Sequence, residues 1–231
     1  MSAPRTMSAN AKSSRVEAAI RILLKSLAAA GALLLTAMPM AQAAAPQPVA
    51  LTAEQEALVS KIETFVNNIT TIKADFVQMS GAGNFARGTL YLQRPGRMRF
   101  EYEPPVPYLL VSDGNFFIYV DNELEQVTYL PLSKTPANLL LRKNFSLSEG
   151  LILTGLKEEG SVIRFEVADS SNPDLGRVTL TFNRDPLSLK SWTVLDPQAQ
   201  RIQVTLVNPL YGNKLDRSLF IYVNKFNRRE E

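Results

Sequence analysis

The sequence predicts a mainly β protein, an incompletely closed antiparallel barrel of about eleven strands preceded by one helix. From Thr70 onward, short runs rich in β-branched and aromatic residues place an apolar side chain at every second position. Turn signals such as Asp113-Gly114, Glu159-Gly160 and Asp196-Pro197 separate these runs. About eleven strands in one chain are enough to curl a sheet strongly or nearly to close it.

The predicted strands form two groups of similar style, with no repeat unit and no internal domain break between them. The runs cover residues 72–77, 88–94, 97–103, 108–112, 115–121 and 125–130, and then 152–158, 161–168, 177–183, 187–195, 201–207 and 219–223. Gly88, Gly96 and Gly114 are interpreted as turn or bulge glycines. We therefore expect one domain over residues 51–231.

One amphipathic helix is predicted over residues 53–69, ahead of the strands. Thr52 and Gln55 have the spacing of a capping box, in which each side chain bonds the other residue's backbone N–H. The apolar residues that follow recur on one helical face, namely Leu58, Ile62, Phe65, Val66 and Ile69. This stripe fits two interpretations, packing in the core or lining a ligand cavity.

A second, short helix is predicted over residues 135–143, between the two groups of strands. Thr135 suits the N-cap position, and Pro136 suits the first helical position because its missing N–H would be unpaired there anyway. A helix inserted at this point is expected to cover the open side of the sheet.

The first residues of the chain have the order of a secretory signal peptide over residues 1–43. Basic residues precede an uncharged run from Leu27 to Met38, which is followed by the small-residue tripeptide Ala41-Gln42-Ala43. The apolar stretch is shorter than the ~20 residues of a membrane span. We expect Sec export to the periplasm, a flexible leader over residues 44–50, and no lipid anchor because the chain has no Cys.

Composition excludes several classes of function. The net charge of +3 belongs to the signal segment, and residues 44–231 hold 20 Lys+Arg against 21 Asp+Glu, so no nucleic-acid partner is expected. Without His or Cys, the chain cannot form a zinc site of those ligands, a haem site with a His ligand, a thiol nucleophile or a Ser-His-Asp triad. No phosphate-binding loop or nucleophile-elbow motif occurs either. We expect neither an enzyme, nor a cofactor, nor a metal centre.

Arg94 stands out against the alternation of its strand. Leu90 and Leu92 lie on the apolar side of residues 88–94, and the same parity places Arg94 on that side. A charge that faces the interior must be paired or hydrogen-bonded. Alternatively, the following Pro95-Gly96 breaks the register, or Arg94 reaches solvent from the strand end. The next strand alternates as well, with Met98, Phe100 and Tyr102 on one face and Arg97, Arg99, Glu101 and Glu103 on the other.

Four motifs in one order make the chain resemble the LolA family, the periplasmic carriers of outer-membrane lipoproteins. They are G-T-L-Y-L-Q-R-P at 88–95, M-R-F-E-Y at 98–102, L-V-S-D-G at 110–114 and T-P-A-N-L-L-L at 135–141. The resemblance spans about residues 52–223. It implies an incompletely closed barrel with short lid helices over a hydrophobic cavity that takes lipoprotein acyl chains.

The resemblance also implies residue roles and partners. Arg94 matches the arginine that reaches from the barrel to the lid and keeps the empty carrier closed. The matching cavity positions are Leu90, Leu92, Met98, Phe100, Tyr102, Leu139 and Leu140. The implied donor is an inner-membrane ABC transporter complex that releases lipoproteins, and the implied acceptor is an outer-membrane lipoprotein receptor. We expect the carrier to be a monomer.

Other classes remain open at this stage. A membrane-attached acceptor resembling LolB would need a lipidated Cys. A periplasmic sensor or binding module of the same fold, resembling RseB, would recognise lipid or a membrane-bound regulator and would carry a second C-terminal domain. An enzyme acting on lipids or glycans would need a polar constellation in the cavity. After residues 219–223 the chain also lacks the longer Pro-Gly-containing tail of many LolA members.

Overall fold

The computed structural model describes residues 47–196 and 199–226. The predicted signal peptide, residues 1–43, lies outside this range. Of the predicted leader, residues 47–50 are described as exposed chain, and the Val49 N–H donates to the carbonyl of Leu153 at 3.0 Å. None of the described helices combines the length and the apolar character that crossing a membrane requires.

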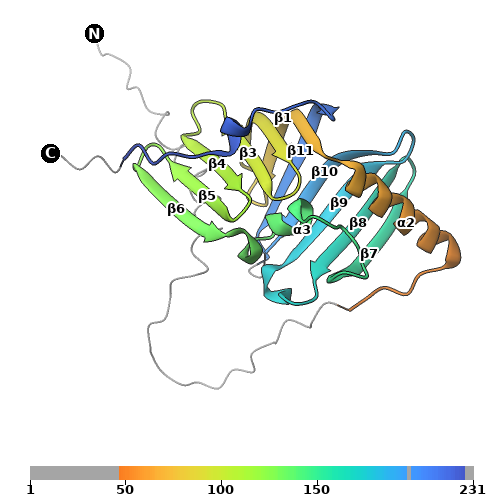
Figure 1. Cartoon of the computed structure of the whole chain (residues 1–231). Helices are drawn as coiled ribbons and strands as arrows, with labels where there is room; N and C mark the ends of the chain where they lie inside the picture. Colours follow the sequence, from red (N-terminus) through yellow and green to blue (C-terminus); the bar gives the residue numbers. More distant parts are fainter. Residues whose placement is uncertain (1–46, 197–198, 227–231) are drawn as a thin grey trace, which may run out of the picture.

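Eleven antiparallel strands of the described chain form one continuous, curved sheet (Figure 1). The order across the sheet is β6-β5-β4-β3-β2-β1-β11-β10-β9-β8-β7, so β6 and β7 are its two edges and the sheet is not closed. The strands are β1 (Thr71–Ser80), β2 (Phe85–Gln93), β3 (Arg97–Tyr102), β4 (Tyr108–Asp113), β5 (Phe116–Asp121), β6 (Gln126–Pro131), β7 (Leu151–Glu159), β8 (Val162–Asp169), β9 (Arg177–Asn183), β10 (Ser188–Leu195) and β11 (Arg201–Tyr211). The predicted fold class is confirmed.

Helix α2 (Ala53–Asn68) begins with the predicted capping box. The Thr52 N–H donates to Gln55 Oε1 at 3.0 Å, and the Gln55 N–H donates to Thr52 Oγ1 at 3.3 Å. Figure 1 shows the helix lying across strands β7 to β9. Val59, Ile62 and Val66 are buried in the main core cluster, and Leu58 and Phe65 are half-buried against it. The apolar stripe therefore packs in the core rather than lining a cavity.

The chain between the two edge strands forms a lid segment, residues 132–143. It contains the short helices η1 (Leu132–Lys134) and α3 (Ala137–Leu141), where a helix is predicted over residues 135–143. The predicted N-cap role of Thr135 is wrong, because the structure places Pro136 at the N-cap. The Thr135 hydroxyl instead donates to the carbonyl of Leu132 at 2.8 Å, which closes η1 rather than opening α3.

The predicted last strand, residues 219–223, is wrong. The chain after β11 forms η3 (Arg217–Phe220) and then irregular structure, and a further short helix, η2 (Pro173–Leu175), lies between β8 and β9. Phe220 is buried, whereas Ile221 and Val223 are exposed. Tyr222 packs on a cluster of Val111, Ile118 and Val120. The alternating pattern is thus satisfied by packing against the outer face of the sheet, not by pairing with another strand.

Gly88 is neither a turn nor a bulge glycine, unlike Gly96 and Gly114, which have φ values of 81° and 108° in turns. It pairs in regular register with Phe76 and Tyr102, and a Cβ built on it would overlap the backbone of Glu101. A side chain at this position would therefore force β2 and β3 apart.

We expect Gly88→Ala to lower the free energy of unfolding by about 3 kcal/mol, because backbone atoms cannot yield as a flexible side chain can. Urea denaturation measures this change. Gly81→Ala is the matched control, since its Cβ would meet Arg201 atoms only at 3.7 Å, and its effect should stay within about 0.5 kcal/mol. Equal stabilities for the two variants would contradict the crowding at Gly88.

Candidate functional site

An apolar cavity of about 110 Å³ lies between the inner face of the sheet and the lid segment. Strands from both halves of the sheet contribute to it, and the lid segment forms one wall. The lining residues are Gln78, Met98, Phe100, Tyr102, Leu110, Phe117, Tyr119, Leu130, Thr135, Pro136, Ala137, Leu140, Val178, Trp192, Val194 and Ile202. Within the described chain, no group of carboxylates is arranged to hold a metal ion.

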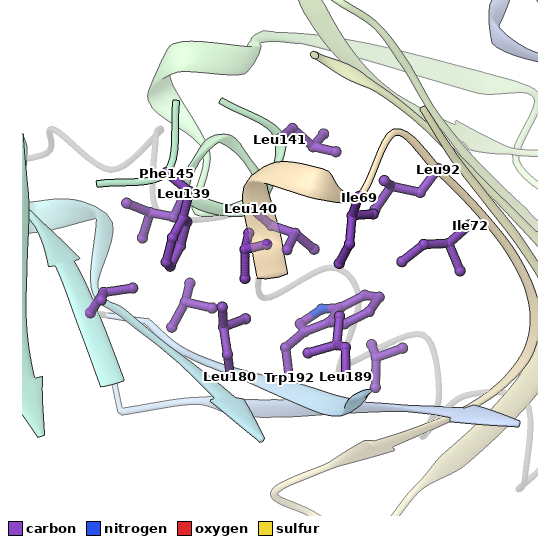
Figure 2. Close-up of a cluster of buried hydrophobic side chains, with 14 of the residues drawn as sticks. Ile69, Ile72, Leu92, Leu139, Leu140, Leu141, Phe145, Leu180, Leu189 and Trp192 are labelled. Atoms are coloured by element: carbon purple, nitrogen blue, oxygen red, sulfur yellow. The ribbon is translucent and has the colours of Figure 1, made fainter. Parts of the chain in front are cut away.

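The structure divides the predicted lining residues into two sets. Met98, Phe100, Tyr102 and Leu140 line the cavity, whereas Leu90, Leu92 and Leu139 do not. The structure places the two β2 residues, Leu90 and Leu92, facing inward and fully buried in the core, where Leu92 pairs with Ile72 (Figure 2).

The position of Leu139 follows from the geometry of α3. Successive residues of a helix project about 100° apart, so neighbouring leucines face different sides. Leu140 faces the cavity, and Leu139 is buried in the core cluster that also contains Phe145 (Figure 2).

Most of the cavity wall was not predicted from the sequence. The unpredicted lining residues are Gln78, Leu110, Phe117, Tyr119, Leu130, Thr135, Pro136, Ala137, Val178, Trp192, Val194 and Ile202. The signal for several of them is strand parity, as for Phe117 and Tyr119, which occupy alternate positions of β5. Parity identifies the inward face but not which inward residues the helices leave uncovered.

Arg94 follows β2 directly and joins three parts of the fold. Its Nη2–H and Nε–H donate to the carbonyl of Arg142 at 2.7 and 3.2 Å, and its Nη1–H donates to the carbonyl of Val66. Longer bonds of 3.4 Å reach Asn67 Oδ1 and the Lys143 carbonyl. Both main acceptors lie at helix ends: Arg142 is the C-cap residue of α3, and the Val66 carbonyl in the last turn of α2 also accepts the N–H of Ile69. The guanidinium thus fastens the end of the lid segment to α2 and to the sheet.

The burial of Arg94 is only partial but has an electrostatic consequence. Removal from water lowers the pKa of Arg94 below its ordinary value. No carboxylate of the described chain bonds to it, and the atoms that accept its hydrogen bonds there are neutral oxygens. The N–H groups of the Arg94 guanidinium bond neutral carbonyls. Water can replace such bonds at a smaller cost in free energy than it can replace a buried ion pair.

The turn between β2 and β3 adds a backbone contact to the lid segment. The N–H of Gly96 donates to the carbonyl of Leu141 at 2.8 Å, and the carbonyl of Gly96 accepts from the Ser112 hydroxyl at 2.6 Å. Three successive carbonyls, those of residues 141–143, are therefore bonded by residues of one turn.

A buried ion pair holds the same end of the lid segment to β8. Arg142 Nη2 lies 3.0 Å from Asp169 Oδ2, and the two side chains are 16% and 7% exposed. Asp169 Oδ1 also accepts from the N–H groups of Ser171 and Asn172. Arg142 is thus fixed from two sides, by Arg94 at its carbonyl and by Asp169 at its guanidinium.

The chain that follows the lid segment is pinned to α2. Asn67 Nδ2–H donates to the carbonyl of Phe145 at 3.0 Å, and the Phe145 N–H donates back to Asn67 Oδ1 at 2.9 Å. The Leu147 N–H donates to Glu63 Oε1 at 2.7 Å. The Phe145 ring is fully buried. The chain after the lid segment is therefore held to α2 by hydrogen bonds, whereas the side chains that line the cavity are mostly apolar.

Two tyrosines of the wall have perturbed acidity. Burial raises the pKa of Tyr102 and of Tyr119 above the ordinary value of about 10, which stabilises the neutral phenols. A group whose pKa is raised on folding adds stability below its unfolded pKa, and that stability is lost as the pH rises through the folded pKa.

We accordingly expect the free energy of unfolding to fall as the pH rises above about 10, because the unfolded chain then releases protons that the folded chain retains. Denaturant titrations from about pH 8 to about pH 11 measure the slope. Tyr102→Phe should make the fall shallower, since one retained proton is removed. A slope unchanged by Tyr102→Phe would contradict the burial of this phenol.

A curled sheet around an apolar cavity, with a cover held by exchangeable hydrogen bonds, defines a protein of the class that carries apolar molecules. The family model described as outer membrane lipoprotein carrier protein LolA matches residues 67–223. The chain belongs to this family and is a LolA-family lipoprotein carrier. The family is periplasmic, and its carriers are not enzymes, as expected from the sequence.

Several known proteins are similar to this chain. An outer-membrane lipoprotein carrier protein of Pseudomonas paraeruginosa is 30% identical over 184 residues, covering 74% of this chain and 85% of the relative. An uncharacterised protein of Rickettsia prowazekii is 24% identical over 127 residues, and the match covers 55% of this chain and 59% of that relative. A solved LolA superfamily protein from Nitrosomonas europaea aligns with a TM-score of 0.45 at 11% identity, covering 71% and 97% of the two chains.

Proposed function

We propose that this carrier accepts lipoproteins from an inner-membrane ABC transporter, holds their acyl chains in the cavity and delivers them to an outer-membrane receptor. The observation that carries the proposal is the cavity itself, whose wall is apolar on the sheet side and on the lid side. The order of basic, apolar and small residues in 1–43 supports export through the Sec pathway before this work begins.

The energetics of acyl chains explain why such a protein is needed. Each buried CH₂ contributes about 0.8 kcal/mol, so a chain of a dozen methylenes is held in a membrane by roughly 10 kcal/mol. Escape into water is correspondingly slow. An apolar cavity in a water-soluble domain lowers this barrier. If the carrier binds the lipoprotein less tightly than the receptor does, the lipoprotein then passes to the receptor.

The lid segment must open for this purpose. The cavity of about 110 Å³ is smaller than the several hundred Å³ of typical ligand pockets. We infer that the described form is the closed form of the carrier and that Arg94 is the latch. The acyl chains would then displace Leu140 and its neighbours, breaking the bonds from Arg94 to the carbonyls of Val66 and Arg142. Met98, Phe100 and Tyr102 would form the wall on which the chains lie.

A reconstituted release reaction tests the proposal. Purified protein without residues 1–43 is mixed with membranes that hold a labelled lipoprotein and the ABC transporter, and ATP is added. We expect a soluble complex of one carrier with one lipoprotein, and no release when ATP or the carrier is left out. Lipoprotein that stays in the membrane under all conditions would overturn the proposal.

A further inference from the structure

Gln78 interrupts the apolar inner face of β1. The preceding inward positions, Ile72, Ala74 and Phe76, are buried and apolar, and Gln78 takes the next inward position on the cavity wall. Its neighbours across the sheet are Ala86 on β2 and Val204 on β11. An amide in such surroundings is unfavourable unless its polar atoms are hydrogen-bonded.

Tyr102 satisfies one half of this amide. Its hydroxyl donates to Gln78 Oε1 at 2.8 Å, and both residues line the cavity. The tyrosine ring is fixed by its neighbours, with the Phe76 ring edge-on at 5.2 Å and the Phe100 ring stacked at 6.2 Å. The bond therefore joins two groups that the strands already hold in place.

The other half of the amide is free to bind a ligand. A glutamine has two N–H donors on Nε2, and within the described chain the Gln78 amide bonds only to Tyr102 through its oxygen. The remaining donors belong to a side chain that forms part of the cavity wall. They can satisfy an acceptor that enters the cavity together with apolar groups.

The position of Gln78 along the sheet determines the orientation of a ligand that it binds. Gln78 pairs with Ala86, and Arg94 lies eight residues further along β2, about 26 Å away for an extended strand. The polar pair and the Arg94 latch are therefore at opposite ends of β2. A ligand with its acceptor at Gln78 would direct its apolar part along the wall toward the lid segment.

We propose that Gln78 and Tyr102 form a subsite for the carbonyl oxygen of the ester or amide that joins an acyl chain to its head group. The Nε2–H of Gln78 donates to this carbonyl, and Tyr102 fixes the amide in the orientation that presents the donor. The inference rests on the proposed function, because it presupposes that acyl chains enter the cavity. It adds a polar contact that distinguishes an acylated molecule from a plain alkyl chain.

Two lipids that differ by one carbonyl test the subsite. The probes are 1-palmitoylglycerol, an ester, and 1-hexadecylglycerol, the ether of the same chain length. Their dissociation constants are measured from the emission of Trp192, the single tryptophan of the chain and a residue of the cavity wall. We expect the ester to bind about fivefold more tightly, the effect of one hydrogen bond in a protected site.

Variants separate the subsite from the cavity as a whole. Gln78→Leu should abolish the preference for the ester while leaving ether binding intact, and Tyr102→Phe should reduce it. Gln203→Leu, on the outer face of β11, is the matched control and should keep the preference. Equal affinity of the wild type for both probes, or a preference retained in Gln78→Leu, overturns the subsite alone. Failure of every protein to bind either probe overturns the proposed function as well.

Discussion

Arg94→Leu is expected to lower the stability of the empty carrier by about 2 kcal/mol and to tighten its hold on acyl cargo about 30-fold. The guanidinium bonds the carbonyls of Val66 and Arg142 in the closed form, and leucine cannot replace these bonds. Because cargo competes with closure, any free energy removed from the closed form is added to the apparent affinity. Release to the receptor should slow accordingly.

Two measurements follow the effect of Arg94→Leu. Chemical denaturation gives the stability of the empty protein, and the rate of lipoprotein transfer from the preformed complex to receptor-bearing vesicles gives release. Arg87→Leu is the control, because Arg87 is an exposed residue of the same strand. Arg94→Lys keeps the charge but loses the fork of donors, so we expect an intermediate effect. Transfer at the wild-type rate by Arg94→Leu would contradict the latch.

Asp169→Ala is expected to have the second large effect, lowering the free energy of unfolding by about 3 kcal/mol. This substitution leaves the charge of Arg142 without a carboxylate at a site where Asp169 is buried and Arg142 is only 16% exposed, which costs far more than losing an exposed pair. It also removes the acceptor for the N–H groups of Ser171 and Asn172. Urea denaturation measures the change.

The control for Asp169→Ala is Glu159→Ala, which breaks the exposed pair between Glu159 and Arg164. Their side chains are 55% and 45% exposed, so we expect less than about 1 kcal/mol. Removing both buried partners, in Arg142→Met with Asp169→Leu, should restore much of the lost stability because no unpaired charge remains. Similar losses for Asp169→Ala and Glu159→Ala would show that the Arg142 contact does not fasten the lid segment.

Local sequence patterns predicted the fold well because they act over short distances. The capping box of Thr52 and Gln55 needs only four residues, and the alternation of Met98, Phe100 and Tyr102 is a property of one strand. The same parity placed Arg94 toward the inner side, and in the structure its guanidinium bonds the carbonyls of Val66 and Arg142. Such features depend on residues that are close together in the sequence.

The cavity could be predicted only in part, because it is what the helices leave uncovered. Leu90 and Met98 both face inward, but only Met98 lines the cavity, since core residues cover Leu90. In α3, likewise, Leu140 lines the cavity whereas the adjacent Leu139 does not. The segment at 219–223 has the pattern of a strand yet packs on the outer face, because an apolar patch around Ile118 is available there. These outcomes depend on contacts between distant segments.

Fluorescence quenching of Trp192 tests most directly whether the cavity holds acyl chains. Trp192 is 5% exposed, lies on the wall, and is the only tryptophan of the chain, so its emission reports on this cavity alone. The carrier is loaded with a lipoprotein whose acyl chains carry bromine atoms, which quench only at short range, and with an unbrominated one as control. We predict strong quenching by the brominated cargo and none by its control. A stable complex in which both cargoes leave the emission equally bright would contradict the account.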